Sequence, residues 1–278
     1  MATQTGVIQL SGKLDKQVYY QRNGKNFARK VQESHQLTEN SRKSGKEFGR
    51  ASAAASMVQK AFSESLGSIM DNECFLRLTS CFGEVIRTAY HKPKGERDVT
   101  DGDLALLNGF QLSRYISGER ILPQDPVVGI SPETKLKIAL HAFPTDPRSR
   151  YKPARAETLV VRLYCGVFHF AKKQGKVVPA VDLEIKLEEA GYFKGGVLDF
   201  PVTEINNRVL IIAAAYHFLD EDGKPINNRK YRAGKILAAA LVRNWKPVPF
   251  RYPAAQAPEL QRSGKAPTAK GSWTLHAK

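Results

Sequence analysis

The sequence predicts an α+β protein with a small β-meander and a helical hairpin at its N-terminal side and an antiparallel β-sandwich at its C-terminal side. Three observations carry this prediction: an Asn23-Gly24 turn between two strand-like runs, apolar residues at helical spacing up to about residue 90, and a change to a period of two after about residue 128. Segregation of helices from strands favours this class over a doubly wound sheet. We expect four parts: a basic β-hairpin arm (1–36), a helical region (37–122), a sandwich (128–252) and a flexible basic tail (253–278).

The hairpin is the most specific local prediction. Both positions of a type I′ turn need positive φ, and Asn followed by Gly tolerates this best. Such a turn opposes Arg22 to Lys25, Tyr20 to Phe27 and Val18 to Arg29 on one face. Two cations directly opposite each other repel, so this ribbon is expected to meet something anionic. Residues 6–10 read as a further short strand of the meander.

Two helices follow the meander. The first runs to about Ser63, with Thr38, Asn40 or Ser41 as its cap. Its apolar stripe either packs on the second helix or faces a neighbouring subunit, and its members are Phe48, Ala51, Ala55, Val58 and Phe62. A different stripe of the same helix is basic and contains Arg42, Lys43, Lys46 and Arg50.

The second helix is expected from Met70 to Tyr90, since apolar residues recur there at helical spacing. A short third helix is expected from Asp101, with Thr100 or Asp101 as its cap. Residues 108–127 contain two Gly and two Pro and read as a connector.

Strand patterns dominate from residue 128. Alternating runs occur at 136–140 and 181–187, long apolar runs at 159–170 and 208–219, and a last run at 236–242. Turn-rich loops separate these runs, and no helix intervenes, which is typical of an antiparallel sandwich. The tail from Pro253 is poor in apolar residues and is expected to be flexible.

The charge narrows the class of partner. The chain has 278 residues and a formal net charge of +16. Residues 1–60 carry 11 basic against 4 acidic residues, and residues 201–278 carry 13 against 5, whereas residues 101–200 are nearly balanced. Basic ends on a neutral body attract nucleic acid, anionic lipid or acidic protein.

The cysteines and apolar runs indicate the compartment. Cys74, Cys81 and Cys165 show neither C-x-x-C spacing nor complete pairing, which indicates free thiols in a reducing compartment. No signal peptide and no run of about 18 apolar residues is recognisable. We expect a location in the cytoplasm or in a particle assembled there, without a membrane partner.

The N-terminal segment resembles a known group. The residues that carry the resemblance are Gly12-Lys13-Leu14, Val18-Tyr19-Tyr20, Arg22-Asn23-Gly24-Lys25 and Arg29-Lys30, with Phe48-Gly49 in the following helix. This pattern is similar to that of uncharacterised bacterial proteins that start with such a hairpin and often end in an Ig-like β domain. The resemblance covers roughly the first 65 residues and part of the sandwich, where Ala213–Lys224 correspond to a strand and Asp-Gly-Lys turn. It implies an Ig-like architecture for the sandwich and adds little about chemistry.

The candidate anion- or partner-binding residues are the basic and aromatic residues of the hairpin and the basic stripe of the first helix. They are Tyr20, Arg22, Lys25, Phe27, Arg29, Lys30, Arg42, Lys43, Lys46 and Arg50. Lysine and arginine neutralise phosphates, and an aromatic ring offers a stacking face. The competing interpretation is that Tyr20 and Phe27 pack on the helices while the charges are solvated. No zinc-finger, RNP or P-loop motif accompanies these residues.

Catalytic and metal-binding patterns are weaker. His141, His169 and His217 fall on predicted strands, where strand alternation explains them better than a zinc site. Cys81 lies on an apolar helix side, where a thiol is usually inert. Asp182 and Glu184 fit the polar face of a half-solvated strand. We therefore predict no catalytic residues, no metal, no cofactor and no enzyme activity.

These observations lead to one expected function and one alternative. The expected function is that of a structural or assembly protein, a component of a virion-like or other large complex, whose basic N-terminal arm docks on partner subunits or on other copies. The alternative is a nucleic-acid-binding protein that uses the basic hairpin and the helix stripe.

Overall fold

The protein is an α+β molecule with antiparallel sheets, as the sequence predicts. The computed structural model describes residues 2–3, 10–31, 36–122, 124–130, 135–145, 151–188, 191–202 and 205–252. By its internal contacts the chain divides into two compact units, Met1–Arg42 and Lys43–Lys278. The expected tail (253–278) and most of the strand expected at residues 6–10 lie outside the described residues.

The first unit holds a four-stranded antiparallel sheet in the order β1-β4-β3-β2. Its strands are β1 (Ala2–Thr3), β2 (Gly12–Leu14), β3 (Gln17–Arg22) and β4 (Lys25–Lys30). The predicted register is confirmed, since Arg22 pairs with Lys25, Tyr20 with Phe27 and Val18 with Arg29. Asn23 and Gly24 have φ of 51° and 72°, as a type I′ turn requires.

The helices of the second unit follow the predicted order. They are α1 (Glu39–Leu66), which begins in the last residues of the first unit, α2 (Cys74–Arg87) and the single turn α3 (Gly118–Ile121). Thr38 is the cap of α1, because its Oγ1 accepts a hydrogen bond from the Ser41 amide at 3.2 Å. The expected third helix at 101 is instead two 3-10 helices, η1 (Val99–Asp101) and η2 (Leu104–Leu107). Their caps are Asp98 and Asp103, so the prediction of Thr100 or Asp101 as the cap was wrong.

The strands of the second unit form a five-stranded sheet in the order β14-β13-β12-β8-β9 and a three-stranded sheet in the order β11-β6-β5, with a short pair β10-β7. Their bounds, together with those of η4 and η5, are β5 (Val127–Ile130), β6 (Lys135–Leu140), β7 (Phe143–Pro144), β8 (Thr158–His169), η4 (Phe170–Lys172), β9 (Gln174–Lys186), β10 (Tyr192–Phe193), β11 (Gly196–Pro201), β12 (Arg208–Leu219), η5 (Arg229–Tyr231), β13 (Ala233–Arg243) and β14 (Lys246–Pro247). All these pairings are antiparallel.

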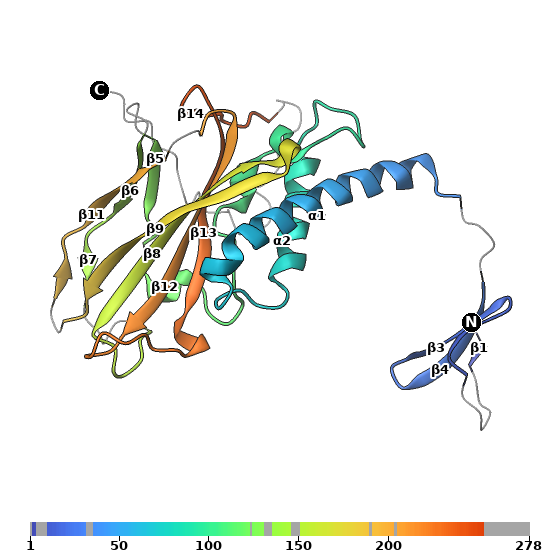
Figure 1. Ribbon diagram of the computed structural model, residues 1–278, viewed down its shortest axis with the longest axis horizontal. Helices are drawn as coiled ribbons and strands as arrows, with labels where there is room; N and C mark the ends of the chain where they lie inside the picture. The colour runs from blue at the N-terminus through green and yellow to red at the C-terminus, as the bar shows by residue number, and fades with distance from the viewer. Residues whose placement is uncertain are drawn as a thin grey trace, which may run out of the picture. The chain divides into compact units, whose positions relative to one another are not determined.

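The central strands β8, β12 and β13 of the five-stranded sheet are buried on both faces. Along β12, residues such as Leu210 and Ile212 pack toward the three-stranded sheet, whereas Val209 and Ile211 pack toward the helices. Figure 1 shows this order of layers, with α1 and α2 on one side of the sheet and β5, β6 and β11 on the other. The continuous apolar runs of β8 and β12 have this cause, because a strand covered on both faces needs no polar side.

The helical region therefore shares its core with the sheet. One cluster of buried residues contains Phe62 of α1 and Phe82 of α2 together with Phe168 of β8. The expected connector 108–127 is also attached to the sheet, since the Gly109 and Leu112 amides donate to carbonyls of β13. In the unit Lys43–Lys278, the helices α1 and α2 and the five-stranded sheet thus share one buried cluster.

Candidate functional site

The hairpin strands present one face that combines cations with aromatic rings. Because side chains alternate along a strand, the pairs Arg22–Lys25, Tyr20–Phe27 and Val18–Arg29 share this face with Lys13, which pairs with Val18. We call the set Lys13, Tyr20, Arg22, Lys25, Phe27 and Arg29 the cation–aromatic face.

The aromatic pair organises this face. The rings of Tyr20 and Phe27 stack with centroids 5.8 Å apart. The guanidinium carbon of Arg29 lies 5.7 Å from the Tyr20 ring centroid, within the range of a cation–π contact. Arg22 and Lys25 are exposed beside them, and the only acidic residue in the sequence 10–31 is Asp15. The face is therefore strongly positive around a stacked pair.

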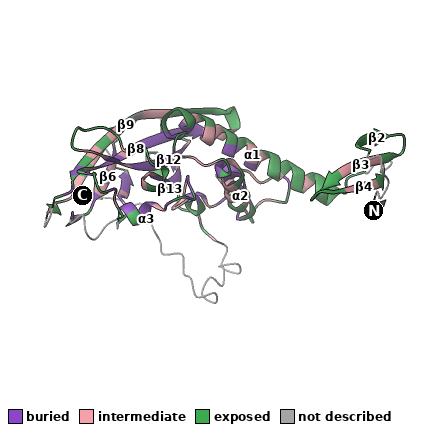
Figure 2. Ribbon diagram, turned by 90° about the horizontal axis from the view of Figure 1, so that it is seen from below, coloured by how far each residue is buried: buried purple, intermediate pink, exposed green. Residues whose placement is uncertain are grey.

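No residue described in 10–31 is buried, and Figure 2 shows β2, β3 and β4 in the colours of exposed and intermediate residues. Tyr20 and Phe27 have intermediate exposure, and Leu14 of β2 is 63% exposed. A small sheet usually needs a second layer to be stable. The described residues of this sheet provide no such layer for themselves.

The remaining candidates do not all join this face. Lys30 pairs with Gln17 and lies on the opposite face of the hairpin. Arg42 and Lys46 are exposed on α1. Lys43 is half-buried and packs against Gly95, where an added Cβ would lie 2.9 Å from its Cγ.

Arg50 is engaged by the second unit. Its guanidinium donates to the carbonyls of Gly95 at 3.0 Å and Arg97 at 2.5 Å. Glu47, one turn earlier, accepts a hydrogen bond from the Gly95 amide at 2.8 Å. Arg50 and Glu47 therefore bind the loop after α2 to α1. Arg42 and Lys46 are the more exposed residues of the basic stripe.

The thiols and histidines lack the features of a reactive site. Burial raises the pKa of Cys81 and of Cys165 to about 12 and that of Cys74 to about 11, which keeps the thiols protonated. His169 accepts a hydrogen bond from the Lys172 amide at its Nδ1, 3.3 Å away. Among the described residues, no three His, Cys, Asp or Glu side chains gather as metal ligands would.

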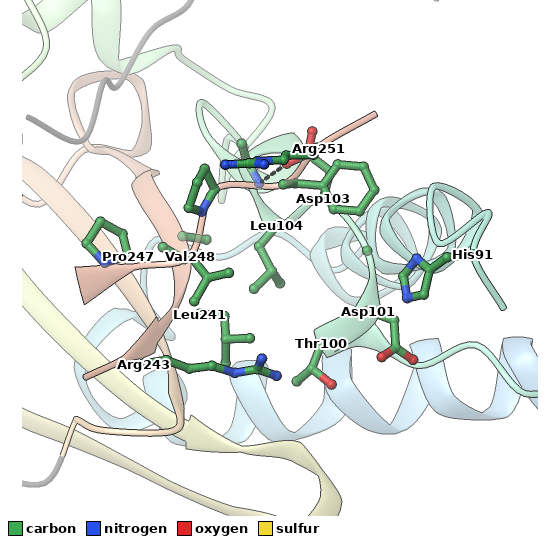
Figure 3. A pocket seen from close by; sticks show the side chains of 16 residues that line it. His91, Thr100, Asp101, Asp103, Leu104, Leu241, Arg243, Pro247, Val248 and Arg251 are labelled. Atoms are coloured by element: carbon green, nitrogen blue, oxygen red, sulfur yellow. Dashed lines mark hydrogen bonds between the residues drawn. The ribbon is translucent and has the colours of Figure 1, made fainter. Parts of the chain in front are cut away.

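A half-open pocket of about 470 Å³ lies between the η1–η2 loop and the end of β13 (Figure 3). Leu104, Leu241 and Val248 form its apolar part, while Asp101 and Asp103 lie on its polar side.

The two carboxylates of this pocket are already used. Asp101 accepts from Lys92 Nζ at 2.8 Å, and Asp103 accepts from the Tyr252 hydroxyl at 2.7 Å and from the Ala105 amide at 3.0 Å. They hold the loop and the segment after β14 in place. This arrangement indicates a structural role rather than a pair of acid–base groups.

A second, polar pocket was not predicted from the sequence. It contains Tyr115, Arg229 and Arg232 from segments far apart in the chain. The cluster Arg229-Lys230-Tyr231-Arg232 is visible in the sequence, but its neighbours across the pocket are not.

Comparison of the chain with protein-family models, with curated proteins and with solved structures found no match. Within the described residues, no helix combines the length and the apolar composition needed to cross a bilayer.

Proposed function

We propose that this protein is a non-enzymatic assembly protein whose N-terminal sheet docks, through its cation–aromatic face, on an acidic partner subunit of a larger complex. The observation that carries the proposal is that no described residue of 10–31 is buried, although the sheet presents a stacked aromatic pair. A partner that packs on Tyr20 and Phe27 adds a second layer to this sheet.

Electrostatics support an acidic partner rather than a second copy. The chain carries a formal net charge of +16, so copies of it repel one another. Arg22 and Lys25 oppose each other across the hairpin, and a carboxylate between them relieves that repulsion. The charges guide the encounter, and the aromatic pair supplies apolar area at its centre.

The second unit has a hydrophobic core of its own. Both of its hydrophobic clusters lie within residues 51–245, so its core does not depend on the first unit. Removal of residues 1–36 is therefore expected to leave the cooperative melt of the second unit intact.

A second candidate function is binding of single-stranded nucleic acid. The arrangement that favours it is Arg29 over the Tyr20 ring with Phe27 stacked beside it. Bases stack on such rings while cations neutralise the phosphates.

The test compares two anionic probes of equal charge, a polyglutamate peptide and an oligothymidylate, by fluorescence anisotropy on the full chain. The assembly proposal expects saturable binding of the peptide that Lys25→Gln and Phe27→Ala each weaken at least about fivefold. Lys16→Gln is the matched control, because Lys16 lies in the β2–β3 turn outside the face. Equal binding of the peptide by wild type and by Lys25→Gln overturns the proposal.

If the protein instead binds single-stranded nucleic acid, a different result is expected. Oligothymidylate then binds more tightly than the peptide, and Phe27→Ala weakens only the oligonucleotide, because each stacked base contributes about 1–3 kcal/mol. That result replaces the assembly proposal.

A further inference from the structure

The second unit contains a polar pocket of about 250 Å³ that the proposed function does not use. Three segments meet there: the turn after α1, the loop before α3, and η5 with the residue that follows it. The residues that matter are Ser68, Asn72, Ser113, Tyr115, Arg229 and Arg232.

Among the described residues, the two arginines of this pocket have no acidic partner. Arg232 donates from Nη2 to Ser68 Oγ at 2.7 Å and from Nη1 to Asn227 Oδ1 at 3.5 Å. The guanidinium carbon of Arg229 lies 6.0 Å from the ring centroid of Tyr115. Within the described part of the chain neither arginine forms a salt bridge, whereas Arg77, Arg97, Arg114 and Arg162 each pair with a carboxylate.

The acidic residue at the pocket is already neutralised. Asp71 accepts hydrogen bonds from Arg77 Nη2 at 2.8 Å and from the amides of Glu73 and Arg114 at 3.0 and 2.9 Å. Burial alone raises the pKa of Asp71, but these hydrogen bonds and the charge of Arg77 lower it overall. Its oxygens are therefore directed to this network, and no carboxylate in the described lining of the pocket pairs with Arg229 or Arg232.

We propose that this pocket binds the phosphate group of a small organic phosphate. Arginine matches phosphate oxygens with paired N–H donors, and the Ser68 hydroxyl and the Asn72 amide add neutral donors on the same lining. A volume of about 250 Å³ exceeds several water molecules at roughly 30 Å³ each, so a substituent fits beside the phosphate. Tyr115, which is 62% exposed, offers that substituent a planar surface.

The proposal is independent of the function assigned to the N-terminal sheet, because every residue involved belongs to the second unit. Inorganic phosphate and a phosphate ester share the chemistry that the arginines recognise. The ester gains further contact only if Tyr115 takes part.

Calorimetric titration of the full chain with AMP, inorganic phosphate and adenosine tests the proposal. We expect AMP to bind at least about fivefold more tightly than phosphate, and adenosine to bind weakest. Arg229→Gln and Arg232→Gln are each expected to weaken AMP binding about tenfold or more, while Tyr115→Ala removes the advantage of AMP over phosphate. If wild type binds AMP and phosphate with equal affinity, the site recognises only the anion, and the proposal of an organic phosphate is overturned.

The matched control is Lys230→Gln, which removes the same charge from the same segment but does not line the pocket. An equal loss in Lys230→Gln overturns the proposal, since it shows a general effect of charge. Absence of saturable AMP binding at millimolar concentration also overturns it, as does unchanged affinity in both arginine variants. Because Arg232 also bonds to Ser68, the melting temperature of each variant is measured, and Arg229→Gln decides the outcome if Arg232→Gln is unfolded.

Discussion

Two aromatic pairs in this protein have similar ring separations and different surroundings. Tyr20 and Phe27 stack at 5.8 Å in the N-terminal sheet, and Phe62 and Phe168 meet at 6.1 Å between α1 and β8. Phe62 is 2% exposed and Phe168 is fully buried, whereas the first pair has intermediate exposure. The contact between rings is thus not what makes a core. Burial of the rings between the helices and the sheet does, as for Phe62 and Phe168, whereas no described residue of 10–31 is buried.

The largest expected effect comes from truncating one phenylalanine in each region. Phe62→Ala leaves a cavity between α1 and the sheet and is expected to cost about 4 kcal/mol of unfolding free energy, measured by urea denaturation. Phe27→Ala is the matched change and is expected to leave the main transition unchanged. A similar loss in both variants contradicts the division into a stable body and a separate N-terminal sheet.

The body also contains a buried charge, whereas no described residue of 10–31 in the N-terminal sheet is buried. The Lys235 side chain is fully buried between Glu119, 3.2 Å away, and Asp125. Lys235→Met leaves these carboxylates without their cation and is expected to cost about 3 kcal/mol. Tyr216→Phe is the control at the same place, because it removes a buried hydroxyl that has no hydrogen-bond partner among the described atoms. It is expected to leave stability unchanged or slightly higher.

The same cluster predicts how stability depends on pH. Burial alone raises the pKa of Glu119, but its hydrogen bonding and the charge of Lys235 lower it overall from the ordinary value of 4.5. A carboxyl with a depressed pKa in the folded state stabilises the protein above pH 4.5, and this contribution is lost as the pH falls through the folded-state pKa. Urea denaturation across this range is expected to show a shallower acid slope for Lys235→Met than for wild type. Parallel slopes contradict the coupling.

A close contact between the Gly102 loop and α2 predicts a somewhat smaller loss of stability than the buried lysine does. Gly102 lies between η1 and η2, and a Cβ added there would come 1.9 Å from the Val85 carbonyl oxygen of α2. Gly102→Ala must push this loop away from α2 and is expected to cost about 2 kcal/mol by thermal or urea denaturation. Gly24→Ala provides the contrast, since nothing lies within 4 Å of its added Cβ and only the positive φ of 72° opposes the change. It is expected to weaken the hairpin without changing the melt of the body.

The two regions also differ in how far sequence predicts them. The register of β3 and β4 follows from the local chemistry of Asn23-Gly24 and was predicted pair by pair. The class of fold follows from the change of period along the chain. The covering of the five-stranded sheet by α1 and α2 was not predicted, although the unbroken apolar run of β12 carries the signal.

Sites built from segments far apart in the sequence are harder to predict than the class of fold. Arg50 was assigned to a basic surface because its helix position was clear, but its carbonyl partners lie 45 and 47 residues further along the chain. The pocket that contains Arg229 and Tyr115 was not predicted for the same reason, because its residues lie far apart in the sequence. Phe48 shows that helical spacing alone can predict burial where there is none. It shares a stripe with Ala51 but is 67% exposed, because the buried face of α1 begins only at Ala51.

The smallest expected effect separates local stability from function in the N-terminal sheet. Lys25→Glu places a carboxylate opposite Arg22 and converts a repulsive cross-strand pair into an attractive one. Amide hydrogen exchange in β3 and β4 of the full chain is expected to slow about threefold, which corresponds to about 0.6 kcal/mol and lies within the range of such pairs. Binding of polyglutamate is expected to weaken in the same variant, because the face has lost a cation and gained an acid. Lys25→Gln removes the repulsion without adding attraction and should fall between the two proteins in both measurements. Faster exchange in Lys25→Glu contradicts the register argument, whereas slower exchange with unchanged peptide binding keeps the register and removes this face from the docking surface.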